Sequence, residues 1–170
     1  TGQVVLLGTM SKTFAPGFRI GWVLAHPDII DRIVVAKQNT DLCTSAFVQK
    51  IAAKYFEKGY FDKNLATINQ NYGIKRDTMI AAFHKYMPKG VKWTEPEGGL
   101  FLFVTLPEYM DAEELFKIAI EENVAFVPGT VFYCDGTGKN TLRINFSFMS
   151  KEMNEEGVKR LANAIKKLMR

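Results

Sequence analysis

Residues 8–22 read Gly8-Thr9-Met10-Ser11-Lys12-Thr13-Phe14-Ala15-Pro16-Gly17-Phe18-Arg19-Ile20-Gly21-Trp22. An apolar run at residues 4–7 precedes this stretch, and a second run at residues 20–25 begins directly after its arginine. Both runs are short, partly β-branched and bounded by Gly or Pro, which is typical of buried strands. We therefore expect two buried strands joined by a loop that carries Lys12 and Arg19.

This loop gathers side chains that suit a phosphate group. Thr9 and Ser11 supply hydroxyl donors, and Arg19 supplies a planar guanidinium that can meet phosphate oxygens in a bidentate pair. The bend at Pro16-Gly17 can return Arg19 toward the strand end at which Lys12 lies. A partly desolvated lysine beside other positive charge holds a neutral amine more readily, and such an amine attacks carbonyl carbons, as in a Schiff base with pyridoxal phosphate (PLP). Singly, these residues also fit an ordinary solvated loop; the combination favours a phosphate-cofactor site.

The segment from Ser11 to Trp22 resembles the cofactor-lysine motif of the fold type I PLP-dependent aminotransferases of class I/II, above all the branch of 2-aminoadipate, kynurenine and aromatic aminotransferases. The resemblance implies that Lys12 is the Schiff-base lysine and general base. It also implies that Thr9, Ser11 and Arg19 hold the phosphate of pyridoxal 5'-phosphate. The implied activity is a ping-pong transfer of an amino group between an amino acid and a 2-oxo acid.

A second arginine stands on a predicted strand. Residues 141–147 alternate between apolar and polar side chains, which places Arg143 on the polar face. On a half-exposed strand, a solvated arginine stacking over its neighbours is the ordinary interpretation. However, residues 97–101, 127–132 and 141–147 all resemble the family's small-domain motifs, in the family's order. The resemblance implies that Arg143 binds the substrate α-carboxylate in a bidentate pair.

Two adjacent glycines lie between two predicted strands. Gly98 and Gly99 would let backbone approach a substrate, which needs no side chain. A plain hairpin turn explains the same two glycines equally well.

The pattern along the chain predicts an α/β protein in two parts. Helical patterns cover about residues 27–37, 45–58, 62–86, 111–122 and 150–168, and strands are expected at 91–94, 100–105, 124–127 and 141–148. Ser45, Asp111 and Ser150 are the expected N-caps. We expect residues 1–60 to be the last strands and helices of a large PLP-binding domain. Residues 61–170 would be a small α+β domain, entered by a long linking helix, with an antiparallel sheet covered by helices.

Composition places the chain among ordinary globular proteins. Its 170 residues are 47% hydrophobic and 24% charged, enough for one good core or two small ones. The net charge is +4, but the basic residues are scattered rather than gathered with aromatics, so this segment is not expected to bind nucleic acid. No apolar stretch is long enough to cross a bilayer and no signal-peptide pattern is present, so we expect a cytoplasmic protein without membrane contact.

Two other patterns carry no chemistry. Cys43 and Cys134 lie far apart, and the two histidines have no short spacing to them, so no metal site is expected and the thiols should be free in a reducing cytosol. Residues 136–140 hint at a phosphate loop. However, Tyr133 stands where that loop needs its first glycine, and Asn140 replaces the Ser or Thr that would meet magnesium. We interpret them as a hairpin turn.

Residues 42–49 also resemble the family, in which this turn lies near the cofactor of the partner subunit. A helix cap explains Ser45 equally well, so we expect a role in a homodimer interface and none in catalysis. The resemblance covers essentially the whole chain but only the C-terminal part of the family's chain. The residues that the family uses to stack on the cofactor ring and pair with its nitrogen precede this segment. We therefore expect a fragment of a longer enzyme, inactive on its own.

Three alternatives remain open. A PLP-dependent lyase of the same fold would keep the cofactor and change the reaction. An aminotransferase-like domain of a DNA-binding transcriptional regulator would keep the fold beside a helix-turn-helix domain. A non-catalytic interaction module would give no reason for Lys12, Arg19 and Arg143 to coincide.

Overall fold

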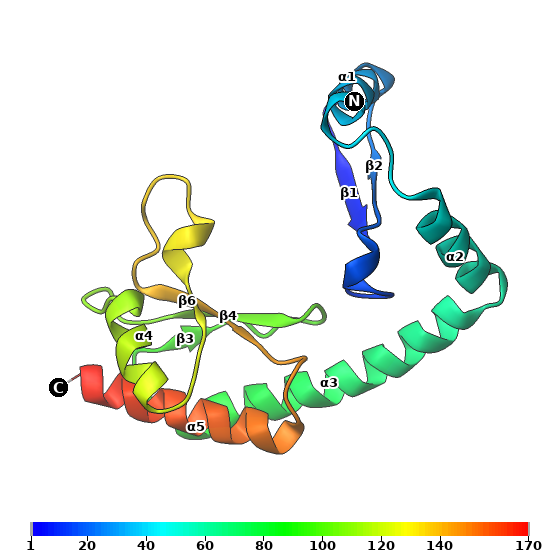
Figure 1. The fold of residues 1–170 in the computed structure, drawn as a ribbon. Helices are drawn as coiled ribbons and strands as arrows, with labels where there is room; N and C mark the ends of the chain where they lie inside the picture. The colour runs from blue at the N-terminus through cyan, green and yellow to red at the C-terminus, as the bar shows by residue number, and fades with distance from the viewer. Residues whose placement is uncertain (1, 170) are drawn as a thin grey trace. The chain divides into compact units, whose positions relative to one another are not determined.

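The computed structural model describes residues 2–169, which form two compact units (Figure 1). The first unit ends at Ile68 and the second begins at Asn69. Helices and antiparallel strands occur in both, which confirms the mixed α/β class. No helix in this part of the chain combines the length and apolarity needed to span a membrane.

The first unit starts with a β-hairpin. Strands β1 (Leu6–Thr9) and β2 (Gly21–Leu24) pair antiparallel, from Leu6 opposite Leu24 to Thr9 opposite Gly21. Their loop contains the short 3-10 helix η1 (Pro16–Phe18). Beyond the ladder, the Met10 amide donates to the Ile20 carbonyl at 3.1 Å. The hairpin therefore extends β1 two residues past the predicted apolar run at 4–7, to the start of the loop.

The prediction that these two strands are buried is wrong for this chain. Leu7 is 72% exposed, Leu24 is 63% exposed and Trp22 is 49% exposed. A two-stranded ribbon cannot bury both of its faces by itself, whereas a near-continuous apolar run is the pattern of a strand with both faces covered.

Two helices and the start of a third complete the first unit. α1 (Pro27–Thr40) begins at residue 27, as predicted, and has a proline in its first turn. α2 (Ala46–Glu57) follows Ser45, but the Ser45 side chain forms no cap hydrogen bond, so that expected cap is absent. The Phe14 ring lies 4.5 Å, centroid to centroid, from the ring of Tyr55 on α2, so the hairpin loop packs on this helix.

The long helix α3 (Tyr60–Tyr86) runs across the boundary between the units. It begins two residues earlier than predicted and ends at the predicted residue 86, shortly before Pro88 and Gly90. Asn64, near its start, donates to the Thr13 carbonyl of the hairpin loop at 2.9 Å, within the first unit.

The second unit is built on a four-stranded antiparallel sheet in the order β3-β4-β6-β5 (Figure 1). Its strands are β3 (Lys92–Trp93), β4 (Phe101–Thr105), β5 (Val127–Pro128) and β6 (Thr141–Asn145). Its further helices are α4 (Ala112–Glu121), the 3-10 helix η2 (Gly129–Phe132) and α5 (Lys151–Leu168). The central pair β4–β6 runs from Phe101 opposite Asn145 to Thr105 opposite Thr141.

The core of this unit lies between one face of the sheet and the helices. Alternate residues of β4 and β6 share it with side chains from α3, α4 and α5: Leu102, Val104, Leu142, Ile144, Phe83, Leu115, Leu161 and Ile165. The expected antiparallel sheet covered by helices is thus confirmed. Arg143 lies on the opposite face, together with Phe101 and Phe103, as the predicted alternation requires.

Candidate functional site

The hairpin loop of the first unit brings four predicted site residues together. The Thr9 hydroxyl donates to the Ser11 hydroxyl at 3.0 Å, and the Ser11 amide donates to the Thr9 oxygen at 3.1 Å. Lys12 and Arg19 lie on the same loop, which closes next to the Thr9–Gly21 pair. The loop therefore concentrates two hydroxyls and two cations at one end of the hairpin.

Arg19 has a strained backbone. Its φ of 52° lies in the left-handed region, which a residue with a Cβ adopts only at a cost of about 1–3 kcal/mol. Its amide and its Nη1 atom both donate to the Pro16 carbonyl, each at 3.3 Å. The amide of Arg19 thus closes η1 before the chain enters β2, and its guanidinium adds a second hydrogen bond to the same carbonyl.

Gly8 and Trp22 of the same motif depend on each other. They face each other in the hairpin ladder, and a Cβ on Gly8 would lie 2.0 Å from the Trp22 ring. The ring therefore lies directly against the Gly8 backbone, where any larger residue would displace it.

The donor set of this loop fits a phosphate group. Hydroxyl, backbone amide and guanidinium donors are the groups that bind phosphate oxygens. Lys12, Thr9 and Arg19 are exposed and Ser11 is half-buried. The expectation of a partly desolvated Lys12 is therefore not met within residues 2–169, and its amine is accessible to a bound molecule.

Arg143, the fifth predicted site residue, belongs to the second unit, whereas the other four belong to the first. Its guanidinium carbon lies 4.1 Å from the ring centroid of Phe101 and 4.6 Å from that of Phe132. Its Nε atom is buried and has no hydrogen-bond partner among the described residues. Arg143 also lines a cavity of about 210 Å³ with Phe101, Phe126 and Asn145.

The loop that holds Gly98 and Gly99 borders a second cavity, of about 440 Å³. Tyr72 and Arg76 of α3 line the same space, and Arg76 donates from Nη1 to the Glu97 carbonyl. Gly99 has a φ of 82°, which favours glycine over any other residue, so the turn itself requires this glycine.

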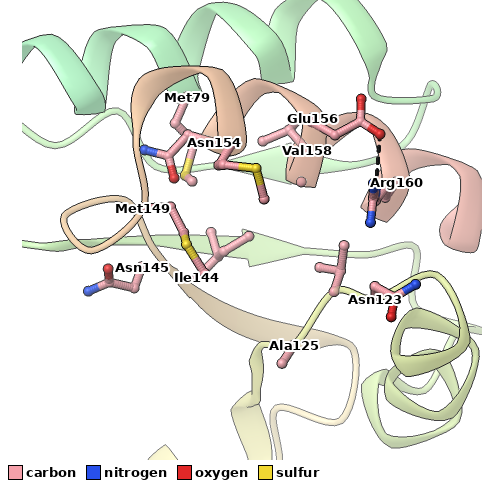
Figure 2. A pocket seen from close by; sticks show the side chains of 13 residues that line it. Met79, Asn123, Ala125, Ile144, Asn145, Met149, Asn154, Glu156, Val158 and Arg160 are labelled. Carbon is pink, nitrogen blue, oxygen red and sulfur yellow. Dashed lines mark hydrogen bonds and ion pairs between the residues drawn. The ribbon is translucent and has the colours of Figure 1, made fainter.

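A third cavity, of about 130 Å³, lies between β6 and α5, as Figure 2 shows. Met79, Ile144 and Met149 give it apolar walls, and the Glu156–Arg160 ion pair, 2.8 Å long, lies at one side. No part of the sequence pattern indicated it. The side chains of Asn145, Asn154, Glu156 and Arg160 at this cavity are hydrogen-bonded to protein groups.

The turn at residues 42–49 lies against the hairpin loop within the first unit. Leu42, Thr44 and Gln49 line a cavity of about 260 Å³ with Ile20 and Gly21. Leu42 and Phe47 are exposed.

Metal-binding side chains are not clustered. Within residues 2–169, no group of three or more His, Cys, Asp or Glu residues lies close enough to hold a metal ion. Cys43 and Cys134 are both exposed and free of disulfides.

Sequence reasoning missed the aromatic surroundings of Arg143 and the role of Arg76. A signal for Phe101 was present: it precedes Phe103 by two residues on β4, so alternation puts both side chains on the face of the sheet that carries Arg143. Phe132 and Arg76 gave no such signal, because a helical segment has no fixed register against a strand of the sheet.

Comparisons with known proteins identify the chain. A family model described as "Aminotransferase class I and II" matches residues 1–161. The aromatic-amino-acid aminotransferase 1 of Thermococcus litoralis is 48% identical over 169 residues, which are 99% of this chain and 40% of that protein.

Solved structures agree. The multiple substrate aminotransferase of Thermococcus profundus is 50% identical with a TM-score of 0.94, over 99% of this chain and 42% of that one. The alpha-aminoadipate aminotransferase of Thermus thermophilus, solved with N-(5'-phosphopyridoxyl)-L-leucine, is 39% identical with a TM-score of 0.91, over 97% and 42%. The chain spans about two fifths of the length of these relatives. By its sequence and its fold, it belongs to the class I and II aminotransferase family.

Proposed function

We propose that this chain is the C-terminal part of a PLP-dependent aminotransferase, which transfers an amino group between an amino acid and a 2-oxo acid. The observation that carries the proposal is the hairpin loop, in which Lys12 lies beside a phosphate-binding donor set. Pyridoxal phosphate is the cofactor that membership of this family indicates.

Each residue of the loop has a defined role in this proposal. Thr9, Ser11 and Arg19 bind the phosphate, which fixes the position of the cofactor. Lys12 carries the cofactor through its Nζ atom. When bound, the cofactor supplies a ring that stores the electron pair of the substrate carbanion.

Lys12 also moves the proton. With the cofactor bound, the free amine of Lys12 would take the proton from the substrate Cα as general base and deliver it, as general acid, to the cofactor carbon that bears the transferred nitrogen. The exposure of Lys12 allows its amine to reach a bound substrate. Arg143 binds the α-carboxylate that amino acids and 2-oxo acids share. Because both substrates use one site in turn, the kinetics are ping-pong.

The domain and subunit arrangement extends the same proposal. Residues 1–60 form the end of a large cofactor-binding domain and residues 61–170 the small domain. The full-length protein is a cytoplasmic homodimer, with the turn at 42–49 in its interface. The exposed apolar side chains of Leu42 and Phe47 support that interface. Light scattering of the full-length protein and of its Phe47→Asp variant tests it, with a dimer expected for the first and dissociation for the second.

Borohydride reduction tests the central role of Lys12. In the full-length protein loaded with PLP, reduction followed by peptide mapping should place the pyridoxyl group on Lys12. A Lys12→Arg variant should carry none, whereas Lys50→Arg, which changes an exposed lysine of α2, should leave the label in place. A label on another lysine would contradict the proposal. Turnover that depends on a 2-oxo acid and releases no ammonia distinguishes the transferase from a lyase.

A further inference from the structure

We propose that Phe132 is a positioning residue, which holds the guanidinium of Arg143 from one face while Phe101 holds it from the other. The terminal nitrogens of Arg143 are thereby presented to the substrate carboxylate. This inference rests on the proposed role of Arg143 in substrate binding.

The geometry is that of a cation between two aromatic rings. The guanidinium carbon lies 4.1 Å from the Phe101 centroid and 4.6 Å from the Phe132 centroid, both within the range of a cation–π interaction. Phe103, which pairs with Arg143 across the β4–β6 ladder, packs edge-on against Phe132 with 6.1 Å between the centroids. Phe132 is therefore held in place by a second ring of the same face.

Aromatic rings suit the surroundings of Arg143 better than a carboxylate would. An acidic partner would occupy the guanidinium fork and compete with the substrate. None of the ion pairs among the described residues involves Arg143, and its buried Nε has no hydrogen-bond partner there. Two rings against the guanidinium restrict a long, flexible side chain without neutralising its charge, which leaves the terminal nitrogens able to bind an anion.

The backbone around Phe132 fixes where its ring lies. η2 begins at Gly129, where a Cβ would lie 1.7 Å from the Thr141 hydroxyl oxygen. This contact seats η2 directly on the start of β6, two residues before Arg143. Val127, just before η2, pairs with Arg143 itself. The 3-10 turn then carries Phe132 over the guanidinium.

Kinetics of the full-length PLP-loaded enzyme test the inference. Phe132→Leu keeps apolar volume and removes the ring. It should lower kcat/KM for an amino acid roughly 5- to 30-fold, mainly through KM, as expected for loss of one cation–π contact. The decarboxylated amine of the same substrate should change by about twofold or less, since it has no carboxylate to bind. Phe132→Tyr, which keeps the ring, should restore most of the loss.

Controls separate this inference from the function on which it rests. Val131→Ala, at an exposed position of the same η2, should change neither substrate. If Phe132→Leu does not fold, judged by cofactor absorbance and circular dichroism, Phe101→Leu takes its place with the same expectation. Equal losses for amino acid and amine, or no loss, would overturn the inference. If Arg143→Ala lowers kcat/KM for the amino acid more than for the amine while neither Phe variant does, only the proposed role of Phe132 is wrong. If Arg143→Ala lowers both equally, the proposed role of Arg143 in carboxylate binding fails as well.

Discussion

Arg76, on α3, donates a hydrogen bond from Nη1 to the carbonyl of Glu97, directly before the Gly98–Gly99 turn. Its Nε atom also donates to the Asp77 carboxylate at 2.8 Å, which orients the guanidinium. One charged side chain of a helix thus anchors the backbone of a loop that borders a 440 Å³ cavity.

Replacing Arg76 with Met should therefore loosen this loop without unfolding the unit. A hydrogen bond from a charged donor contributes about 1.5–3 kcal/mol, and partial exposure of Arg76 reduces this to roughly 1–2 kcal/mol. Amide hydrogen exchange at Gly98 and Gly99 should then accelerate about 5- to 30-fold in the full-length protein. Lys159→Met on the exposed side of α5 should leave that exchange unchanged. An unchanged rate in Arg76→Met would show that the loop is held by its own turn.

Alanine substitutions at Gly129 and Gly157 should change the free energy of unfolding in opposite directions. A Cβ at Gly129 meets Thr141 at 1.7 Å, whereas a Cβ at Gly157, inside α5, meets no atom within 4 Å. Gly129→Ala should lower the free energy of unfolding by about 1–3 kcal/mol through overpacking. Gly157→Ala should raise it by about 0.5–1 kcal/mol, because alanine favours the helix. Thermal denaturation followed by circular dichroism measures both; a loss in Gly157→Ala or no loss in Gly129→Ala contradicts these contacts.

Glu155 gives the second unit a pH-dependent contribution to stability. Hydrogen bonds from Lys85 and from the Tyr86 hydroxyl, each 3.0 Å long, lower the pKa of its carboxyl below the ordinary 4.5. Because the pKa is lower when folded, this contribution is present above the unfolded pKa and is lost as pH falls through the folded pKa. Carboxyl carbon NMR should show the depressed pKa, and Lys85→Met should return it toward 4.5. Lys117→Met on α4 is the control; a pKa of Glu155 unaffected by the loss of Lys85 would refute the assignment.

The 170-residue chain by itself should self-associate and transaminate little. Leu7 and Leu24 expose apolar surface on the β1–β2 hairpin, and exposed apolar strands pair with other chains. We also expect weak PLP retention. By the resemblance described above, the residues that the family uses to stack on the cofactor ring lie outside residues 1–170. Light scattering and dialysis against PLP measure both properties, and Leu24→Lys should reduce association. A monomeric preparation with a stable cofactor band and rapid turnover would contradict this expectation.

Local sequence signals predicted the elements whose ends are set by local hydrogen bonds. Asp111 accepts from the Glu113 amide at 2.7 Å and Ser150 from the Met153 amide at 3.2 Å, so both expected N-caps of α4 and α5 are confirmed. Ser45, the expected cap of α2, forms no side-chain cap hydrogen bond; in the same turn the Gln49 side chain donates to the Thr44 carbonyl.

Strand ends depended on side chains that alternation does not reveal. β6 stops at Asn145 rather than at Phe148, because the Asn145 side-chain oxygen accepts from the amides of Ser147 and Phe148 and turns the chain out of the ladder. Residues 124–126 form no strand, since the Val124 amide donates back to Ala119 and Asn123 has a φ of 58°. The alternation of β6 predicted the correct face for Arg143. The position of Phe132 beside it could not be predicted, because it depends on the close packing of η2 against the start of β6.

The two rings against Arg143 also bear on how the full-length enzyme would respond to dissolved salt. Counter-ions screen a charge from the sides that water reaches, and two phenyl rings lie against this guanidinium. Attraction between Arg143 and a bound carboxylate is therefore confined to one edge and shielded from the bulk electrolyte. Substrate affinity should then vary only weakly with ionic strength, unlike that of a site built on freely solvated lysines.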